Sequence, residues 1–259
     1  MAFNFSSKLL EYCAYQVEFF DLNDQSWQGH FGFAEILTKE LQPKKIVELG
    51  TLNGNSYFVF CQAVKQHGLS TSCTAVGSWR SEHDEQQPAL NNMYQRILAY
   101  NQKEYSGFST ILRRDLTESA SDFDDESIDV LNIDGAKSKA DIQHLFSLYA
   151  AKVRPGGLVL IHDVNDDIKG CTVNKFWHTL QEQNAENCLT FPQTNGLGVW
   201  RKPGGKRFKS AIFNVLMGGD TPERTLAIKY ITMMTDRALC YHYLYHQKQM
   251  IEQLRSGKK

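Results

Sequence analysis

The sequence predicts an α/β domain built around a mostly parallel β-sheet. Short apolar runs rich in β-branched residues alternate with segments whose apolar residues recur at helical spacing, a pattern typical of parallel βαβ units. The last two extended runs follow each other after only a short turn, which predicts an antiparallel hairpin at the sheet edge. The 259 residues suffice for one large α/β domain, or for a domain of about 200 residues with an appendage.

The expected elements follow in order along the chain. Apolar residues at helical spacing predict two N-terminal helices, at 8–20 and 31–41, and Gln42-Pro43 ends the second. After them, strands are expected at 45–49, 73–77, 108–114, 128–134 and 158–163. Helices are expected at 57–67, 89–101 and 174–183, and one more helix, before the strand at 158–163, ends at 152–157. The edge hairpin is expected at 187–191 and 197–203.

The residue pattern of the chain changes after Pro203, where the alternation of strands and helices ends. This change predicts a domain at 1–203 and a helical extension at 204–259. Residues 206–217 form a short basic amphipathic segment. Thr221-Pro222 then predicts the N-cap and first turn of a long helix. At 1.5 Å per residue a helix to Leu254 would be about 50 Å long.

This long helix carries too many apolar side chains to be a solvated rod. Three interpretations stay open: it packs on its own domain, it forms an interface with a second copy or a partner, or it lies on a membrane surface. The third would use the basic side chains of Lys206, Arg207 and Lys209.

Composition excludes several classes of protein. Hydrophobic residues make up 42% of the chain, and 28 Lys and Arg nearly balance 29 Asp and Glu, so neither disorder nor a generally basic nucleic-acid binder fits. The start lacks the pattern of a signal peptide, and no run reaches the roughly 18 apolar residues of a membrane span, so we expect a cytoplasmic protein. The six cysteines form no C-x-x-C pair and are expected to be reduced thiols.

A glycine loop follows the first expected strand. In ELGTLNGNS (48–56) the strand ends at Glu48, and Gly50 and Gly54 form a G-x-x-x-G spacing before a helix. Glycine lets bare backbone approach a ligand, and the helix N-terminus offers free N–H donors. The spacing is neither G-x-G-x-x-G nor a P-loop.

Six stretches in order over residues 27–200 resemble class I S-adenosylmethionine-dependent methyltransferases. They are WQGHFGFAEIL, IVELGTLNGNSYFVFCQAVK, VGSW, SIDVLNIDG, RPGGLVLIHD and NGLGVW. The chain is more closely similar to the type 24 methyltransferase domains found beside glycosyltransferases in bacterial polysaccharide and secondary-metabolite pathways. The resemblance implies a Rossmann-like seven-stranded sheet, with S-adenosylmethionine across the C-terminal ends of the strands.

The resemblance also implies the residues that would hold this cofactor. Trp79 and Asp115 would lie near the adenine, although Trp79 is equally a core aromatic and Asp115 equally a helix cap. Asp134 would orient the cofactor amine or the substrate. The residues implied around the methionine part are Glu48, Gly50, Thr51, Gly54 and Ser56.

One position departs from the family pattern. The second strand usually ends in an acidic residue that accepts hydrogen bonds from both ribose hydroxyls, and this chain has Gly77 there. Two charge-assisted hydrogen bonds of roughly 1.5 to 3 kcal/mol each would be missing. Either Glu82 or Asp84 replaces the carboxylate from the next loop, or the domain binds the cofactor weakly or not at all.

Polar residues that end the fourth and fifth strands predict a reacting centre. Asp134 ends one strand and His162-Asp163 the next, so they should face one crevice. His162 could act as a general base near neutral pH. His30, in W-x-G-H before the first strand, either contacts substrate or merely starts a helix.

The patterns IDGAK and IHDVN are similar to those of metal-dependent catechol-type O-methyltransferases. That similarity implies Asp134, Asp163 and a displaced Asn165 as Mg²⁺ ligands, with Lys137 as the base; carboxylate oxygens suit this ion. In the type 24 group a histidine is commoner at position 137, and here Val164 separates Asp163 from Asn165. Alternatively, Asp163 is a hydrogen-bonded strand end without metal.

The sequence therefore predicts an S-adenosylmethionine-dependent O-methyltransferase that methylates a sugar hydroxyl of a glycan or glycosylated metabolite. The alternative is a catalytically silent module of the same fold that acts as a scaffold or as the partner of a glycosyltransferase. The C-terminal helix could also form a homo-oligomer. No N-P-P-[YF]-type motif and no basic stripe is present, so no nucleic-acid substrate is expected.

Overall fold

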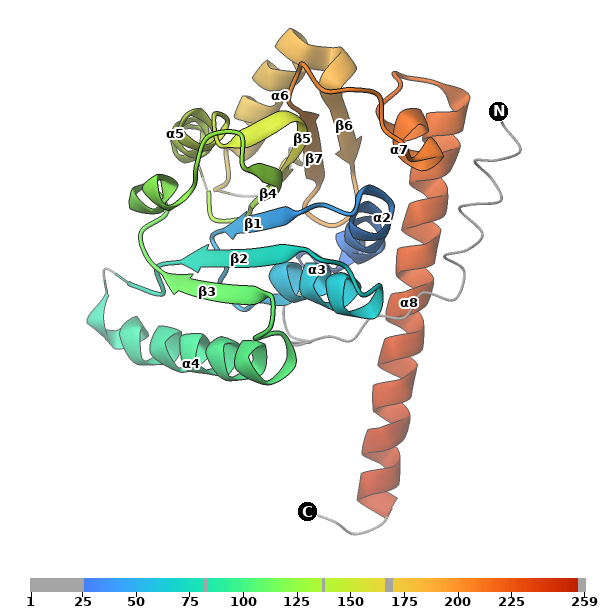
Figure 1. The fold of residues 1–259 in the computed structure, drawn as a ribbon. Coiled ribbons are helices and arrows are strands. Elements are labelled where there is room, and N and C mark those ends of the chain that lie inside the picture. The colour runs from blue at the N-terminus through green and yellow to red at the C-terminus, as the bar shows by residue number, and fades with distance from the viewer. Residues whose placement is uncertain (1–25, 82, 137, 166–169, 256–259) are drawn as a thin grey trace.

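The computed structural model describes residues 26–81, 83–136, 138–165 and 170–255 (Figure 1). They form a seven-stranded sheet with the order β3-β2-β1-β4-β5-β7-β6, in which β7 runs antiparallel to β5 and β6 and the other pairs are parallel. The strands are β1 (Lys45–Leu49), β2 (Ser72–Gly77), β3 (Ser109–Arg113), β4 (Ile128–Ile133), β5 (Val153–His162), β6 (Cys188–Phe191) and β7 (Leu197–Arg201). The predicted fold class, edge hairpin included, is confirmed.

The helices agree with the sequence pattern except near their ends. Helix 8–20 lies outside the described residues. Strand β5 begins at Val153 rather than at residue 158, because Val153 pairs with Ile128 before a register shift. The α-helices are α2 (Phe31–Leu41), α3 (Asn55–Gln66), α4 (Gln87–Glu104), α5 (Lys139–Tyr149), α6 (Val173–Asn184), α7 (Ala211–Leu216) and α8 (Pro222–Arg255). Short 3₁₀ turns are η2 (Gln28–His30), η3 (Asp84–Gln86), η4 (Glu118–Asp122) and η5 (Ala185–Asn187).

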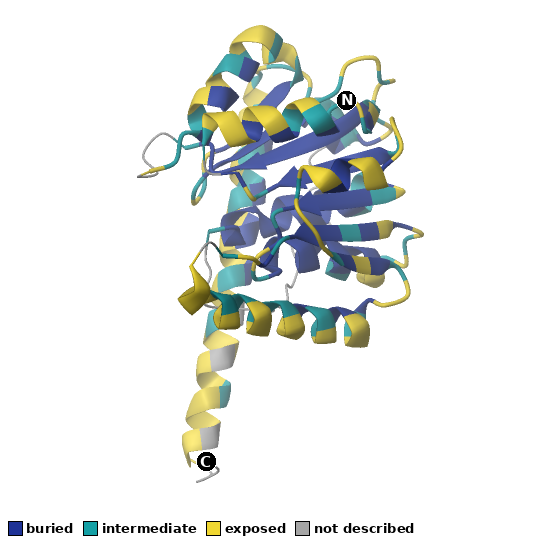
Figure 2. Ribbon diagram, turned by 90° about the vertical axis from the view of Figure 1, so that its left-hand side faces the viewer, coloured by how far each residue is buried: buried dark blue, intermediate teal, exposed yellow. Residues whose placement is uncertain are grey.

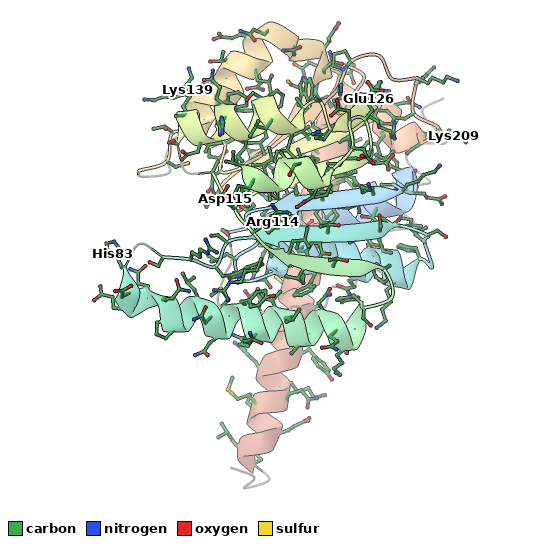
Figure 3. The ribbon with its side chains drawn as sticks, turned by 60° about the vertical axis from the view of Figure 1, so that its left-hand side comes forward. His83, Arg114, Asp115, Glu126, Lys139 and Lys209 are labelled. Atoms are coloured by element: carbon green, nitrogen blue, oxygen red, sulfur yellow. The ribbon has the colours of Figure 1, made fainter. Side chains whose placement is uncertain are left out.

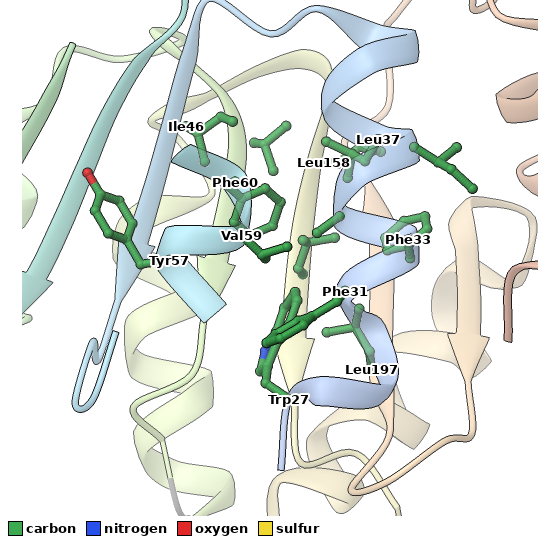
Figure 4. Close-up of a cluster of buried hydrophobic side chains, with 14 of the residues drawn as sticks. Trp27, Phe31, Phe33, Leu37, Ile46, Tyr57, Val59, Phe60, Leu158 and Leu197 are labelled. Atoms are coloured by element: carbon green, nitrogen blue, oxygen red, sulfur yellow. The ribbon is translucent and has the colours of Figure 1, made fainter. Parts of the chain in front are cut away.

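Two apolar clusters, one on each face of the sheet, form the core. Strand side chains alternate between them: Ile46 joins the cluster with α2, α3, α7 and α8, and Val47 joins the cluster with α5 and α6. Figure 4 shows part of the first cluster, where Phe31, Phe33 and Trp27 lie between α2 and the sheet. The sheet is thus buried on both faces, as the continuous apolar strands predict.

Helix α8 belongs partly to this core and partly projects beyond it (Figure 1). Thr221 caps it as expected, because its hydroxyl accepts a hydrogen bond from the Arg224 N–H at 3.1 Å. Ala227 and Ile231 are buried against the first cluster. Farther along, the helix is mostly exposed (Figure 2), and the side chains of Leu244 and Leu254 are 67% and 76% exposed.

These contacts decide among the three interpretations of α8 only for its first half, which packs on its own domain. Because α7 and the start of α8 share the core with α2, the division of the chain at residue 203 stays a prediction. Among the described helices, none combines the length and apolar character that a membrane crossing needs. The five described cysteines are free thiols, as expected.

Candidate functional site

The carboxyl ends of β1, β4 and β5 bring the predicted polar residues together. Strand β4 lies between β1 and β5 and pairs in parallel with both, with Leu49 opposite Ile133 and Ile133 opposite Ile161. The residues at these strand ends therefore share one edge of the sheet. This is the edge at which open α/β folds bind ligands.

Glu48 is fully buried at the end of β1, and hydrogen bonds surround its carboxylate. The Thr51 hydroxyl donates to one oxygen at 2.7 Å, and the Asn132 amide donates to the other at 2.8 Å. Ser56 also bonds to this side chain. Burial, followed by the charge of Asp134, raises the pKa of Glu48 to about 7. Glu48 thus sits under the glycine loop and holds that loop against β4.

The glycine loop crosses β4 so closely that no side chain fits there. Gly50 has φ +91°, and a Cβ at this position would lie 2.2 Å from the Cα of Gly135. The N–H groups of Gly50 and Thr51 bond to the carbonyl of Val76. At Gly54 φ is +88°, and a Cβ would lie 2.7 Å from the ring of Phe58. Gly54 and the first residues of α3 are buried, and the close approaches at Gly50 and Gly54 account for the two glycines of the G-x-x-x-G spacing.

Asp134 and His162 form a buried pair at the ends of β4 and β5. The His162 Nδ1 lies 2.7 Å from an oxygen of Asp134, and its Nε2 lies 3.0 Å from the carbonyl oxygen of Ser26. A carbonyl can only accept, so Nε2 carries a proton, and the carboxylate accepts the proton on Nδ1. Burial lowers the pKa of His162, but Asp134, Asp163 and the Ser26 carbonyl together raise it above its usual value.

Access to solvent differs within this pair. The Asp134 side chain is 21% exposed, whereas that of His162 is 2% exposed. Both ring nitrogens of His162 are also occupied, so this imidazole holds Asp134 from behind. The geometry supports a positioning role for His162 rather than direct contact with a substrate, and Asp134 is the member of the pair that faces outward.

Asp163 and Asn165 follow β5 but point to different partners. Asp163 is buried with φ +64°; its carboxylate lies 3.3 Å from His162 Nδ1 and accepts a hydrogen bond from Asn195 at 2.9 Å. The Asn165 amide instead donates to the carbonyls of Pro192 and Thr194, at 3.0 and 2.9 Å. Asn165 therefore ties down the loop before β7, and the structure does not bring its amide into the cluster of Asp134, His162 and Asp163.

This cluster only partly fits the predicted Mg²⁺ site. Ligand atoms of Asp134, His162 and Asp163 lie within 4.8 Å of one another. However, the His162 Nδ1 is hydrogen-bonded to Asp134 at 2.7 Å and lies 3.3 Å from an oxygen of Asp163, so a ring nitrogen stands between the two carboxylates, whereas Mg²⁺ prefers oxygen ligands. Lys137, the base implied with that metal, lies outside the described residues. We therefore assign no step of the chemistry to Mg²⁺.

His30 and Trp27 cover His162 from the N-terminal side. The rings of His30 and His162 meet edge to face at 5.7 Å, and Trp27 lies 6.3 Å from His162. His30 is 1% exposed, and its Nε2 is 3.2 Å from the Thr194 hydroxyl. Burial and then His162 lower the pKa of His30 well below its usual value, which favours the neutral form of this ring.

The other half of the edge, at β2 and β3, has a different character. A Cβ on Gly77 would lie 2.5 Å from the Thr51 carbonyl and 2.9 Å from the ring of Trp79. Trp79 has φ +44° and is 3% exposed. Its indole N–H donates to the Leu52 carbonyl at 2.9 Å, and its ring contacts Tyr94. An indole ring therefore packs where the family pattern has a carboxylate.

Neither Asp84 nor Asp115 supplies the missing carboxylate in this structure. Asp84 is exposed on η3, and Glu82 lies outside the described residues. Asp115 accepts hydrogen bonds from the N–H groups of Thr117 and Glu118 at 2.8 and 3.2 Å, which is the capping alternative. Figure 3 shows Asp115 at the carboxyl end of the sheet. A contact of Asp115 or Trp79 with adenine remains a prediction.

Three residues of the site were missed by sequence analysis: Asn132, Asn195 and Trp27. Asn132 did give a signal, because it is a polar residue inside an otherwise apolar strand. Its partner could not be found without the register that places it opposite Glu48. Trp27 and Asn195 lie in the motifs W-x-G-H and NGLGVW, but the sequence assigned them no role, because loops place them next to His162 and Asp163.

Comparison with known proteins supports this description of the fold. Residues 47–164 match the model of a family described as a methyltransferase domain. An uncharacterized protein of Sinorhizobium fredii, y4gI, is 38% identical over 190 residues, which cover 72% of this chain and 20% of that protein. The chain thus spans about a fifth of the length of this curated relative.

Two solved structures have the same fold at low sequence identity. The O-methyltransferase TomG from Streptomyces achromogenes, in complex with S-adenosylmethionine, has a TM-score of 0.50 and 15% identity, over 78% of this chain and 98% of that one. The Podospora anserina methyltransferase PaMTH1, bound to S-adenosylhomocysteine, has a TM-score of 0.52 and 12% identity, over 77% and 95%. The fold is therefore that of class I methyltransferases.

Proposed function

We propose that this chain, whose residues 47–164 match a methyltransferase domain, is an S-adenosylmethionine-dependent O-methyltransferase. The observation that carries the proposal is the convergence of Glu48, the bare glycine loop and the Asp134–His162 pair at one edge of the sheet. The proposed acceptor is a hydroxyl group, and the sequence resemblance favours a sugar hydroxyl of a glycan or glycosylated metabolite.

The methionine half of the cofactor fits the residues present. Gly50 and Gly54 let the loop turn at the sheet edge without side chains, Thr51 and Ser56 hold Glu48 in place, and Asp134 offers a partly exposed carboxylate for the cofactor amine or the acceptor. When bound, S-adenosylmethionine supplies an electrophilic methyl group. The ribose half fits less well, because Gly77 offers no carboxylate and Trp79 packs beside it.

Methyl transfer to a hydroxyl needs an oriented acceptor and a group that receives its proton. We assign the proton to Asp134, because its carboxylate faces outward and His162 fixes its orientation from behind. His162 and Asp163 then act as positioning residues, and His30 covers the pair. Lys137, two residues after Gly135, remains a second candidate for the base.

Calorimetric titration with S-adenosylmethionine and S-adenosylhomocysteine, each with and without Mg²⁺, tests the proposal. We expect micromolar binding of both ligands and no effect of Mg²⁺. Asp134→Asn should weaken S-adenosylmethionine at least tenfold, whereas Asp124→Asn, a change at an exposed carboxyl far from this edge, should not. No binding of either ligand at millimolar concentration would refute the proposal.

A second candidate function is supported by two observations. Trp79 packs against Gly77 where the ribose carboxylate is expected, and the far half of α8 exposes apolar side chains such as Leu244. Both are consistent with a silent scaffold or glycosyltransferase partner that uses α8 as an interface. A chain truncated after Leu239 keeps the buried part of α8. If α8 is an interface, this truncated chain should no longer bind a partner or form a dimer, whereas the full chain with Asp134→Asn should still do so. The opposite result would exclude this alternative.

A further inference from the structure

A hollow lies at the amino-terminal edge of the sheet, opposite the edge described above. It has a volume of about 550 Å³ and is lined by the start of β4, the first half of β5, the end of β7 and the segment 204–209. Figure 3 shows Lys209 at the end of the sheet away from Arg114 and Asp115. A volume of this size is typical of sites for small molecules.

Positive charge dominates the lining of this hollow. Five cationic and two acidic residues line it. They are Arg154, Arg201, Lys206, Arg207 and Lys209, with Glu40 and Asp129 as the acids.

Both acids are already engaged. Asp129 accepts hydrogen bonds from the backbone N–H groups of Lys44 and Lys45, at 2.8 and 2.9 Å, and from the guanidinium of Arg154. Glu40 accepts one from the Ser210 hydroxyl. The side chains of Lys206, Arg207 and Lys209 have no carboxylate partner within the described part of the chain. The hollow therefore carries a net positive charge that the residues described by the structure do not neutralise.

Arg201 lines this hollow with one of its hydrogen-bond donors unused. Its guanidinium lies 4.0 Å from the ring centroid of Phe208 and donates to the Lys206 carbonyl. Its Nε is buried and has no hydrogen-bond partner among the described residues. Burial, and then the positive charge of Arg154, lowers the pKa of Arg201. A buried donor without an acceptor beside a like charge is the arrangement that a bound anion would stabilise.

Bare backbone forms the floor next to Arg201. A Cβ on Gly205 would lie 2.2 Å from the Cα of Gly156 and 3.1 Å from a terminal nitrogen of Arg201. Gly156 and Gly204 have φ of +76° and +86°. Two glycine turns are thus pressed together under the guanidinium, and no side chain separates it from the cavity floor.

We propose that this hollow is a binding site for a small phosphorylated molecule, with Arg201 as its central ligand and Arg207 and Lys209 at its rim. The class of ligand is a phosphate or pyrophosphate group, since planar guanidinium groups match such oxygens in bidentate geometry. The site is separate from the proposed methyl-transfer site, and it stands whether or not that activity is found.

Titration of the full chain with inorganic pyrophosphate and with uridine diphosphate, followed by calorimetry without Mg²⁺, tests this site. We expect saturable one-to-one binding that weakens as the salt concentration rises. Tighter binding of uridine diphosphate would indicate a nucleotide source, and equal binding would indicate recognition of the phosphates alone. Either result supports the site.

Arg201→Gln should weaken pyrophosphate at least tenfold, and Lys248→Gln, a change at an exposed cation on α8, should have no effect. If Arg201→Gln does not fold, the double variant Arg207→Gln/Lys209→Gln replaces it, since both side chains are exposed, and a fivefold loss is expected. No binding at 10 mM, or equal binding by all variants, would overturn the proposal. Binding of S-adenosylmethionine should be unchanged in each variant, which keeps the two sites distinguishable.

Discussion

At the carboxyl ends of β1, β4 and β5, each acidic side chain is buried or partly buried and has a hydrogen-bond partner, whereas the end of β2 presents Gly77 and the ring of Trp79. Glu48 is held by Thr51 and Asn132, and Asp134 by His162. At β2 the indole of Trp79 donates to the Leu52 carbonyl and contacts the ring of Tyr94. The ends of β1, β4 and β5 thus carry acids, and the end of β2 is filled by packing.

The difference indicates which part of the edge carries the groups for a chemical step. Burying a carboxylate is unfavourable unless hydrogen bonds compensate for it, and the β1–β4–β5 half supplies such bonds at every acid. The β2–β3 half keeps the shape of the fold without the carboxylate that its strand end usually carries. The following predictions test whether the two halves differ in this way.

The largest effect is expected at the crossing of the glycine loop and β4. Gly50→Ala would place a Cβ 2.2 Å from backbone at a φ of +91°, so strain and crowding add, and we expect a loss of about 3 to 5 kcal/mol in unfolding free energy. Gly68→Ala is the matched control, because Gly68 also has positive φ but nothing lies within 4 Å of its Cβ position. The control should lose only about 1 kcal/mol. Equal losses in urea unfolding would show that the close crossing is unimportant.

The second prediction concerns the end of β2, where Gly77 stands in place of an acid. The family pattern alone predicts that Gly77→Asp restores a cofactor contact. The structure instead predicts a loss of about 2 to 3 kcal/mol, because the new Cβ meets the Thr51 carbonyl and the Trp79 ring. Urea unfolding of Gly77→Asp measures this directly.

A double-mutant cycle identifies the cause. Trp79→Ala by itself should lower the free energy of unfolding. Gly77→Asp should then cost at least about 1 kcal/mol less in the Trp79→Ala background than in the wild type, since the ring is gone. Strict additivity of the two changes would contradict the proposed packing. A tenfold gain in S-adenosylmethionine affinity in Gly77→Asp alone would mean that Trp79 yields readily and that the two halves differ less than the structure indicates.

The strand pattern carried enough information to predict the fold and the edge on which the acids meet. Alternating apolar residues fix which side of each strand is buried, and consecutive parallel strands end at the same edge. Contacts made across the sheet or by loops were not predictable. Asn132 reaches Glu48 only through the register of β1 and β4, and the Ser26 carbonyl reaches His162 from 136 positions away in the chain. The sequence therefore placed His162 at the site, but it did not show that His162 lies on the buried side of Asp134.

The third prediction uses the buried charge of the acid-bearing half. Because the pKa of Glu48 is raised from 4.5 to about 7, the folded protein retains a proton that the unfolded chain releases between these values. Stability should therefore fall as pH rises from 5 to 7, by up to about 3 kcal/mol from this group. His162 adds to the same trend, since its raised pKa gives stability that is complete below 6.5 and is lost at higher pH. His30, with a lowered pKa, opposes it only below 6.5.

Urea unfolding at pH 5, 6, 7 and 8 measures this slope. Glu48→Gln should flatten it, because the amide does not titrate and can still bond to Thr51 and Asn132. Glu104→Gln is the control, since hydrogen bonds from Lys103 and Lys65 lower the pKa of that carboxylate to about 2, outside the range tested. An unchanged slope in Glu48→Gln would mean that Glu48 is ionised in the folded protein at pH 5.

The smallest effect is expected for Asn165, and it distinguishes a structural role of this residue from a metal-binding one. Its amide donates to two carbonyls of the loop before β7, so Asn165→Ala should lower unfolding free energy by about 1 to 2 kcal/mol and Tm by roughly 3 to 6 °C. Asn195→Ala removes a comparable bond, to Asp163, and should behave alike.

If Asn165 were a ligand, 10 mM Mg²⁺ would raise the Tm of the wild type but not of Asn165→Ala, because a ligand that binds only the folded state stabilises it. For each of the three proteins we expect the same Tm with and without Mg²⁺, since the ring nitrogen of His162, bonded to Asp134 and 3.3 Å from Asp163, already lies between the two carboxylates.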